Sequence, residues 1–151
     1  MEYPETFLRG VPNDKDFVYG VYPQTSLFRF ETNPDREDDG YDELSINWED
    51  DEKAVDLILC QQKKDKEGKP CIQFDYGYSR MRLSHVATMV SAHIKDGVFA
   101  YERRPVGASE LNPENPYHGN LLFNREKKEL KKLIQNALAT LASVELVRRD
   151  G

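Results

Sequence analysis

Alternating apolar and polar positions predict six short strands along this chain. Valine, isoleucine, tyrosine and phenylalanine recur at these positions, and such residues suit a pleated surface that is buried on one side. The only tryptophan, Trp48, ends one alternating segment and is expected to anchor that strand in the core. The predicted strands comprise residues 17–22, 26–30, 44–48, 72–78, 98–101 and 121–123.

Apolar residues at helical spacing predict an amphipathic helix near the end of the chain, with lysines on its other side. A shorter helix is predicted after Ser84, which would cap its first turn, and Gly97 would end it. The apolar positions of the C-terminal helix are Leu130, Leu133, Ile134, Ala137, Leu138 and Leu141, and those of the shorter helix are Val86, Met89, Val90 and Ile94.

The segment at 54–60 fits either a helix or a buried strand. A helix is favoured, because Asp50 and Asp51 can accept hydrogen bonds from its first amides and three lysines follow toward the negative end of the helix dipole. Gly68-Lys69-Pro70 would then stop the helix. The alternative is a hairpin that turns through residues 65–69.

Two segments without regular periodicity are expected to be loops. Residues 33–40 contain no apolar side chain and should form an exposed acidic loop. Residues 105–116 hold three prolines, and a loop of this length is often functional. The sequence therefore predicts a single domain, residues 1–151, of α+β (or α/β) class. Its mixed sheet would have about five or six strands, packed by two or three helices that include the C-terminal one.

Composition adds limits on the compartment. Aromatic residues make up 11% of the 151 residues, which is too many for a disordered chain. The sequence contains no apolar run of the ~18 residues that a membrane span needs, and its first residues lack a signal-peptide pattern. We therefore expect a cytoplasmic protein without membrane association. Cys60 and Cys71 lie in apolar segments and are expected to be buried and reduced.

The acidic charge is concentrated in the first third of the chain. Residues 1–52 contain 15 acidic and 4 basic side chains, whereas residues 53–151 contain 12 and 17. This separation can steer the docking of a charged protein partner. The lysines of the C-terminal helix would suit phosphate contacts, but the formal net charge of −6 argues against nucleic acid as the partner.

Ligand spacing argues against metal sites formed within single segments, so that Cys60, Cys71, His85, His93 and His118 could meet at a metal only through the tertiary fold. Residues 35–40 imitate the first half of a calcium-binding EF-hand loop, but the twelfth position is Ile46 instead of the bidentate glutamate that the ion needs. His85 and His93 are eight residues apart, which is too far for both to ligate one metal from a helix. Neither a metal nor another cofactor is therefore expected.

One candidate for catalysis is the pair formed by Arg80 and His85. The two residues have the spacing of the catalytic motif of HEPN ribonucleases. That motif lies in an all-α bundle, whereas here it spans the end of a predicted strand and the start of a helix. A surface arginine beside a partly buried histidine is therefore the favoured interpretation.

The second candidate is the turn at residues 112–120, where two Asn-Pro steps impose extended or turn geometry. It would present Tyr117 and His118 together, and His118 could act as a general base oriented by Glu102, Glu110 or Glu114. We find no nucleophile elbow and no phosphate-binding glycine loop, so a structural turn is favoured. The candidate binding residues are Asn115, Tyr117, His118 and Asn120.

Three short segments resemble landmarks of small bacterial proteins of unknown activity. They are Phe7-Leu8-Arg9-Gly10, Leu44-Ser45-Ile46-Asn47-Trp48 and Asn115-Pro116-Tyr117-His118-Gly119-Asn120. In those proteins an arginine segment, a Leu-Ser-Val/Ile-Asn strand and a late Asn-Pro-x-His turn recur in this order. The resemblance implies a bacterial cytoplasmic protein and no particular mechanism.

These observations lead to two functional hypotheses. The first is a non-catalytic protein-interaction, immunity or regulatory accessory protein, because a catalytic constellation is missing and the charges are separated along the chain. The alternative is a small enzyme, such as a nuclease-like toxin, that uses His118 or the Arg80/His85 pair.

Overall fold

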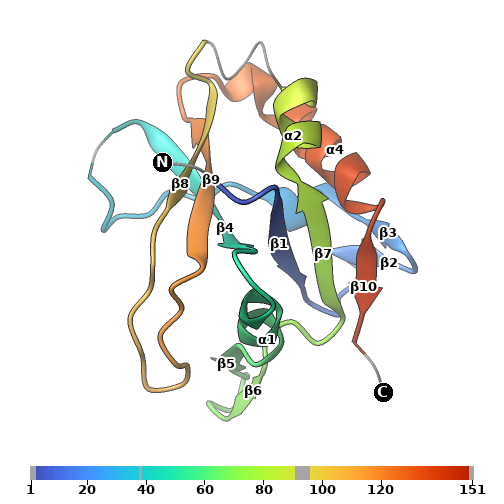
Figure 1. Ribbon diagram of the computed structural model, residues 1–151, viewed down its shortest axis with the longest axis vertical. Coiled ribbons are helices and arrows are strands. Elements are labelled where there is room, and N and C mark those ends of the chain that lie inside the picture. Colours follow the sequence, from blue (N-terminus) through green and yellow to red (C-terminus); the bar gives the residue numbers. More distant parts are fainter. Residues whose placement is uncertain (1–2, 38, 91–95, 150–151) are drawn as a thin grey trace.

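The computed structural model describes residues 3–37, 39–90 and 96–149. Its centre is a six-stranded sheet in the order β10-β7-β1-β4-β9-β8, in which every neighbouring pair is antiparallel (Figure 1). The strands are β1 (Thr6–Val11), β4 (Tyr41–Trp48), β7 (Gly77–Arg82), β8 (Phe99–Arg103), β9 (His118–Asn124) and β10 (Leu146–Arg148). Two small hairpins pair β2 (Val18–Tyr19) with β3 (Tyr22–Pro23) and β5 (Gln62–Lys64) with β6 (Pro70–Ile72).

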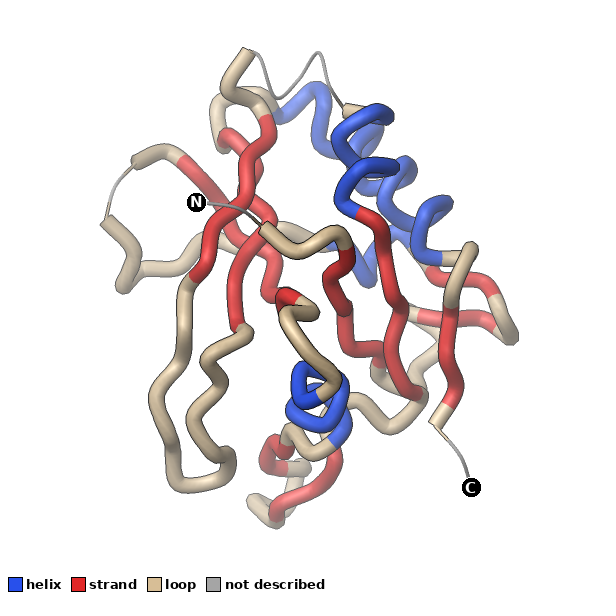
Figure 2. Tube along the Cα trace, viewed as in Figure 1, coloured by secondary structure: helices blue, strands red, loops and turns tan. Residues whose placement is uncertain are grey.

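The described helices cover both faces of the sheet. They are α1 (Lys53–Leu59), α2 (Leu83–Met89), α4 (Lys131–Ala142) and the 3-10 helices η1 (Thr25–Phe28) and η2 (Lys128–Leu130). Helix α1 packs on one face, against β1, β4 and β7, while α4 packs with η1 and α2 on the other (Figure 2). Successive residues of β1 show this division, because Phe7 joins the larger core under α4 and Leu8 joins the smaller core under α1.

The predicted α+β class is confirmed, and so is its amphipathic C-terminal helix. The sheet is antiparallel throughout, however, so the expectation of a mixed sheet is wrong. The strand predicted at 44–48 is present and begins earlier, at Tyr41, and Trp48 is fully buried as expected. On α4, Ile134 and Leu138 are buried, whereas Leu133 lies on the exposed side.

The ambiguous segment at 54–60 is helical. Asp51 accepts a hydrogen bond from the Lys53 amide at the start of α1, as expected, whereas Asp50 binds Arg103 instead. The helix ends before the lysines, because the chain turns into the β5–β6 hairpin at the place where the alternative had a turn. The Asp65 side chain stabilises that turn by accepting hydrogen bonds from the backbone amides of Glu67 and Lys69.

Residues 26–30 do not form the predicted strand. Leu27 and Phe28 are consecutive and both fully buried against α4, which a 3-10 turn permits and the alternation of a strand does not. Residues 17–22 contribute only to the two-residue strands of the β2–β3 hairpin, with Gly20 at a positive φ between them.

The continuous strand predicted at 72–78 is also interrupted. Strand β6 ends at Ile72 and β7 begins at Gly77, and the residues between them leave the small hairpin to join the main sheet. Gly77 has a φ of 145°, a conformation that side chains rarely allow. Its hydrogen atom also leaves room for the backbone of β10, since a Cβ there would lie 2.0 Å from the Val147 carbonyl oxygen.

Three smaller expectations also need correction. Ser84 does not cap a helix, because it lies within α2 and donates its hydroxyl to Glu5. Cys60 is exposed rather than buried, at the end of α1. Strand β9 begins three residues before the predicted 121–123 segment, so the late turn residues His118 and Asn120 are part of the sheet. The predicted helical position Ile94 lies outside the described residues.

Gly119, in β9, permits a contact between β4 and the edge strand β8. The Trp48 indole N–H donates to the Glu102 carbonyl oxygen at 2.9 Å, directly across Gly119. A Cβ on Gly119 would lie 2.2 Å from Nε1 of Trp48 and 2.3 Å from that oxygen. Both contacts are far shorter than any side chain tolerates.

We therefore expect Gly119→Ala to destabilise the protein by about 2–4 kcal/mol, because the indole must move and its buried N–H loses an acceptor. The free energy of unfolding in urea measures this effect. Gly107→Ala is the matched control, since its Cβ would meet nothing within 4 Å. Equal stability of the two variants would contradict the role given to Gly119.

Candidate functional site

Strands β1 and β4 pair over only two residues and then separate. Phe7 pairs with Trp48 and Leu8 with Asn47. If the same register continued, the next pair to exchange backbone hydrogen bonds would be Gly10 and Ser45. That pair does not form, and further along β4 the backbone of Glu43 bonds instead to Glu31. The sheet therefore has a split at its centre, between Gly10 and Ser45.

The side chain of Arg9 bridges this split. Its Nη1 donates to the Ser45 carbonyl oxygen at 2.9 Å, and its Nε donates to the Leu27 carbonyl oxygen at 3.0 Å. Arg9 thus replaces the missing strand contact on the β4 side and also ties η1 to the sheet. Two of its five N–H groups are used in this way.

A cavity of about 360 Å³ lies at the split. Its size falls in the range of small-molecule sites in proteins. Its apolar wall comes from α1, from the segment before β7 and from the long loop before β9, through Leu57, Ile58, Phe74, Val106 and Pro113. All three segments of the sequence resemblance also reach it, through Arg9, Gly10, Ser45, Asn47, Asn115 and His118.

Amide side chains hold the walls of the cavity in place. Asn47 donates to the Ala54 carbonyl oxygen of α1 and accepts from Asn115, so it links the helix to the long loop. Asn112 binds both backbone groups of Gln62, which fixes the same loop to β5. The side chains of these asparagines are already hydrogen-bonded within the protein, so their role is to shape the cavity.

Other polar groups at the cavity have no protein partner within the described part of the chain. They are the remaining N–H groups of Arg9, the Ser45 hydroxyl, the side-chain amides of Gln61 and Gln73, and Nε2 of His118. They come from five separate segments of the chain. The cavity therefore offers donors and acceptors to an occupant in addition to an apolar wall.

The lining of the cavity contains no aspartate or glutamate, although the chain carries 27 of them. Arg9 is half-buried and has no carboxylate within ion-pair distance among the described residues. Burial lowers the pKa of Arg9 to about 10, and the charge of Glu31 opposes that change. The guanidinium is still cationic at neutral pH, so the cavity favours negative charge.

His118 is fixed by a backbone carbonyl rather than by a carboxylate. Its Nδ1 lies 2.8 Å from the Arg104 carbonyl oxygen, which can only accept, so Nδ1 carries a proton. Burial lowers the pKa of His118, against the effect of this hydrogen bond, and the neutral ring leaves Nε2 as an acceptor. The expectation that Glu102, Glu110 or Glu114 orients His118 is therefore wrong.

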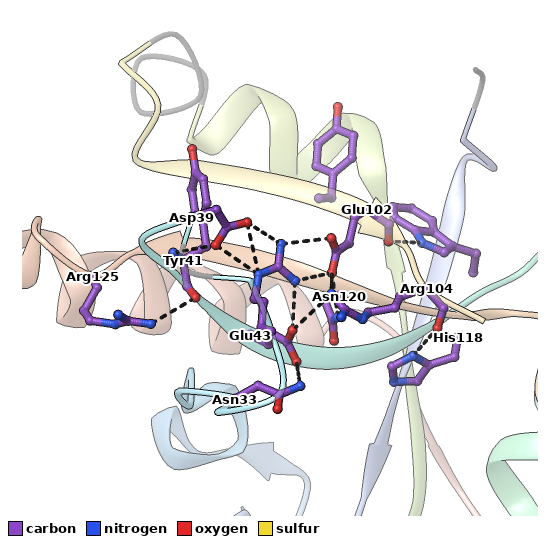
Figure 3. Close-up of polar contacts among 12 residues, drawn as sticks. Asn33, Asp39, Tyr41, Glu43, Glu102, Arg104, His118, Asn120 and Arg125 are labelled. Atoms are coloured by element: carbon purple, nitrogen blue, oxygen red, sulfur yellow. Dashed lines mark hydrogen bonds and ion pairs between the residues drawn. The ribbon is translucent and has the colours of Figure 1, made fainter. Parts of the chain in front are cut away.

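A second polar group, the Arg36 cluster, lies on the same face of the sheet (Figure 3). Arg36 returns from the acidic loop to bind the carboxylates of Asp39 at 2.8 Å, Glu43 at 2.8 Å and Glu102 at 2.6 Å. Its side chain is only 8% exposed. The loop predicted to be exposed at 33–40 therefore contains a largely buried arginine in ionic contact with carboxylates.

The Arg36 cluster also lowers the pKa of Glu102 and reaches Asn120 and Arg104. Burial alone would raise the pKa of Glu102, but hydrogen bonds from Arg36 and Asn120 outweigh it and hold that pKa below its usual value. Asn120 donates to Glu102 at 2.8 Å, and its buried Oδ1 has no partner in the described structure. Arg104 lies 3.6 Å from Glu102 and so connects the cluster to His118.

The other sequence-derived candidates are placed elsewhere. The Tyr117 hydroxyl donates to Asp51 at 2.8 Å and its ring packs on the core under α1. Arg80 binds Glu49 at 2.7 Å and Glu145 at 2.5 Å. His85 is exposed on α2, and the described structure shows no contact between it and Arg80.

The structure thus separates the four candidate binding residues. Asn115 and His118 line the cavity, while Asn120 belongs to the Arg36 cluster and Tyr117 to the region around Asp51. Sequence reasoning missed Gln61, Gln73 and Phe74, which carry no motif. Arg9 could have been found, since it belongs to the first of the three resembling segments.

Neither a metal centre nor a membrane span is found among the described residues. They contain no group of three histidine, cysteine or acidic side chains placed to hold a metal ion. None of the helices they form is long and apolar enough to span a bilayer.

Comparison with protein families, with curated proteins and with solved structures finds no match to this chain. The resemblance to small bacterial proteins therefore stays a prediction.

We expect Arg36→Met to destabilise the protein by about 1–3 kcal/mol at pH 7, because partly buried carboxylates lose their cation. The pKa of Glu102 is lowered in the folded protein, so ionised Glu102 stabilises the fold. This stabilisation is present above the pKa of Glu102 in the unfolded chain and is lost as the pH falls through the pKa in the folded protein. The difference from wild type should therefore shrink below about pH 4. Urea unfolding between pH 7 and 3 measures it.

Lys69→Met is the matched control, since Lys69 meets Glu67 at 3.9 Å with both side chains 76% exposed. This change should leave stability unaltered at every pH. A deficit of Arg36→Met that stays constant down to pH 3 would contradict the charge-pairing explanation.

Proposed function

We propose that this protein is a non-catalytic regulatory accessory protein that acts by binding, with the cavity at the β1–β4 split as its recognition site. The observation that carries the proposal is the convergence of the three resembling segments on one cavity. They are separated by more than thirty residues in sequence, and each contributes polar side chains to the same space.

The chemistry of the lining supports binding over catalysis. The cavity is lined by two serine hydroxyls, those of Ser45 and Ser109, and neither has a hydrogen bond to the His118 ring in the described structure. Carboxylates that could relay protons are held by arginines outside the cavity, as Glu102 is by Arg36. The site therefore presents fixed donors and acceptors without an activated group.

A small enzyme that uses His118 is the second candidate. One observation favours it: the neutral imidazole of this cavity-lining residue is held at Nδ1, and its Nε2 has no hydrogen-bond partner in the described structure, as a general base requires. The Arg80/His85 version has no comparable support, because Arg80 is held by two glutamates.

The proposal also includes a protein partner in a bacterial cytoplasm. Its supports are the separation of charge along the chain and the resemblance to small bacterial proteins. Binding in the cavity would then adjust the affinity for that partner, as expected of an accessory or immunity protein.

The test is a thermal-shift and titration screen of the full chain with organic acids, phosphates, nucleotides and short peptides. We expect at least one compound to bind, and to bind at least about tenfold more weakly to Ser45→Leu, whose larger side chain enters the cavity. Thr88→Leu, at an exposed position of α2, is the control and should bind as wild type does.

Mass spectrometry of the recovered compound distinguishes binding from catalysis. An unchanged compound agrees with the proposal. A chemical conversion that disappears in His118→Ala would contradict it and favour the enzyme. A screen without any binding would contradict the cavity as a recognition site.

A further inference from the structure

We propose that the cavity binds a small monocarboxylate with an apolar body, whose carboxylate rests on Arg9 at the β1–β4 split. This inference rests on the proposed function, because it names the ligand class of the same cavity.

The guanidinium of Arg9 is positioned to receive an anion. Its two protein contacts are both to neutral carbonyl oxygens, those of Leu27 and Ser45, and three of its N–H groups have no partner in the described structure. The charge of Glu31 acts on Arg9 without an ion pair between them, and a half-buried cation with no carboxylate in contact is costly to maintain. A carboxylate at this position would offset that cost and take charge-assisted hydrogen bonds.

The backbone at the split adds donors that strand pairing would otherwise use. The Thr6 carbonyl accepts from the Glu49 amide, so even-numbered residues of β1 direct their backbone groups toward β4. Gly10 follows this alternation and has no partner residue on β4. It lines the cavity next to Arg9, where its N–H supplements the guanidinium.

A single cation favours a carboxylate over a phosphate. Sites for phosphate groups usually combine several cations, a glycine-rich loop or the start of a long helix. The lining of this cavity contains one arginine, no lysine and no such loop. Planar carboxylates suit the planar guanidinium and carry the one charge that Arg9 can balance.

The rest of the ligand would contact an apolar surface. The Phe74 ring lies directly over Gly10, where a Cβ would be 2.4 Å from the ring, so the glycine brings this ring next to the anion position. Leu57 and Val106 extend the same wall from α1 and from the long loop. The Gln61 and Gln73 amides are available for any further polar group on the ligand.

The experiment compares 3-phenylpropanoate, its amide and phenethyl phosphate by calorimetric titration of the full chain at pH 7. We expect the carboxylate to bind at least about tenfold more tightly than the isosteric amide, because only the carboxylate carries charge for Arg9. Nitrogen NMR should show shifts at the Arg9 Nε and at the Gly10 and Ser45 amides.

Arg9→Gln should abolish the preference for the acid over the amide. Arg82→Gln, a change at an exposed arginine at the end of β7, is the control and should keep that preference. If Arg9→Gln does not fold, the comparison of acid and amide on wild type, with the NMR shifts at Gly10 and Ser45, decides the question alone.

The outcomes separate this inference from the proposed function. Equal binding of acid and amide would overturn the carboxylate inference and leave the cavity as a binding site. Tighter binding of phenethyl phosphate would overturn the choice of carboxylate in the same way. If none of the three probes binds, the inference is overturned, and the proposed function fails as well only if the wider screen is empty.

Discussion

Where β1 and β4 separate, two strands at the centre of a sheet lose their mutual hydrogen bonds, and Arg9 makes that arrangement tolerable. A carbonyl group that leaves a strand ladder needs another hydrogen-bond donor, from the protein or from water, and the Ser45 carbonyl needs such a donor here. Arg9 supplies it and at the same time binds Leu27. One side chain therefore connects β1, β4 and η1, and the split is part of the fold instead of a local fault.

The cavity is a consequence of that split. Paired strands would bring Gly10 against Ser45 and leave no space between them. Because the strands diverge, α1 covers one side of the opening while the long loop before β9 closes another, held by Asn47, Asn112 and Asn115. Both of these walls depend on asparagine side chains bound to backbone or to each other, which explains how a proline-rich loop is held in a defined position.

Local periodicity was sufficient for the parts of the fold whose burial follows a simple repeat. The α4 helix and the β4 strand could be predicted because one face of each is buried along its whole length. Residues 26–30 and 72–78 could not, because Leu27 and Phe28 are buried consecutively and Gly77 starts a new strand. The cavity could not be predicted from the sequence for a related reason. The pairing of β1 with β4 stops after Leu8, and tertiary contacts decide where strand pairing stops.

The acidic segment has a role in the chemistry of the cavity that its composition does not reveal. Glu43 lines a neighbouring cavity together with Arg9, Asp16 and Glu31, and an ion pair between Glu43 and Arg9 would cancel the charge of Arg9. Arg36 instead binds Glu43 together with Glu102, and it does so because the loop at 33–40 folds back onto the sheet. In the described structure the hydrogen bonds of Arg9 are then to carbonyl oxygens alone, and Glu31 acts on it only through its charge. The charge at the cavity thus depends on a second arginine outside it, in the segment that the sequence marks as solvated and acidic.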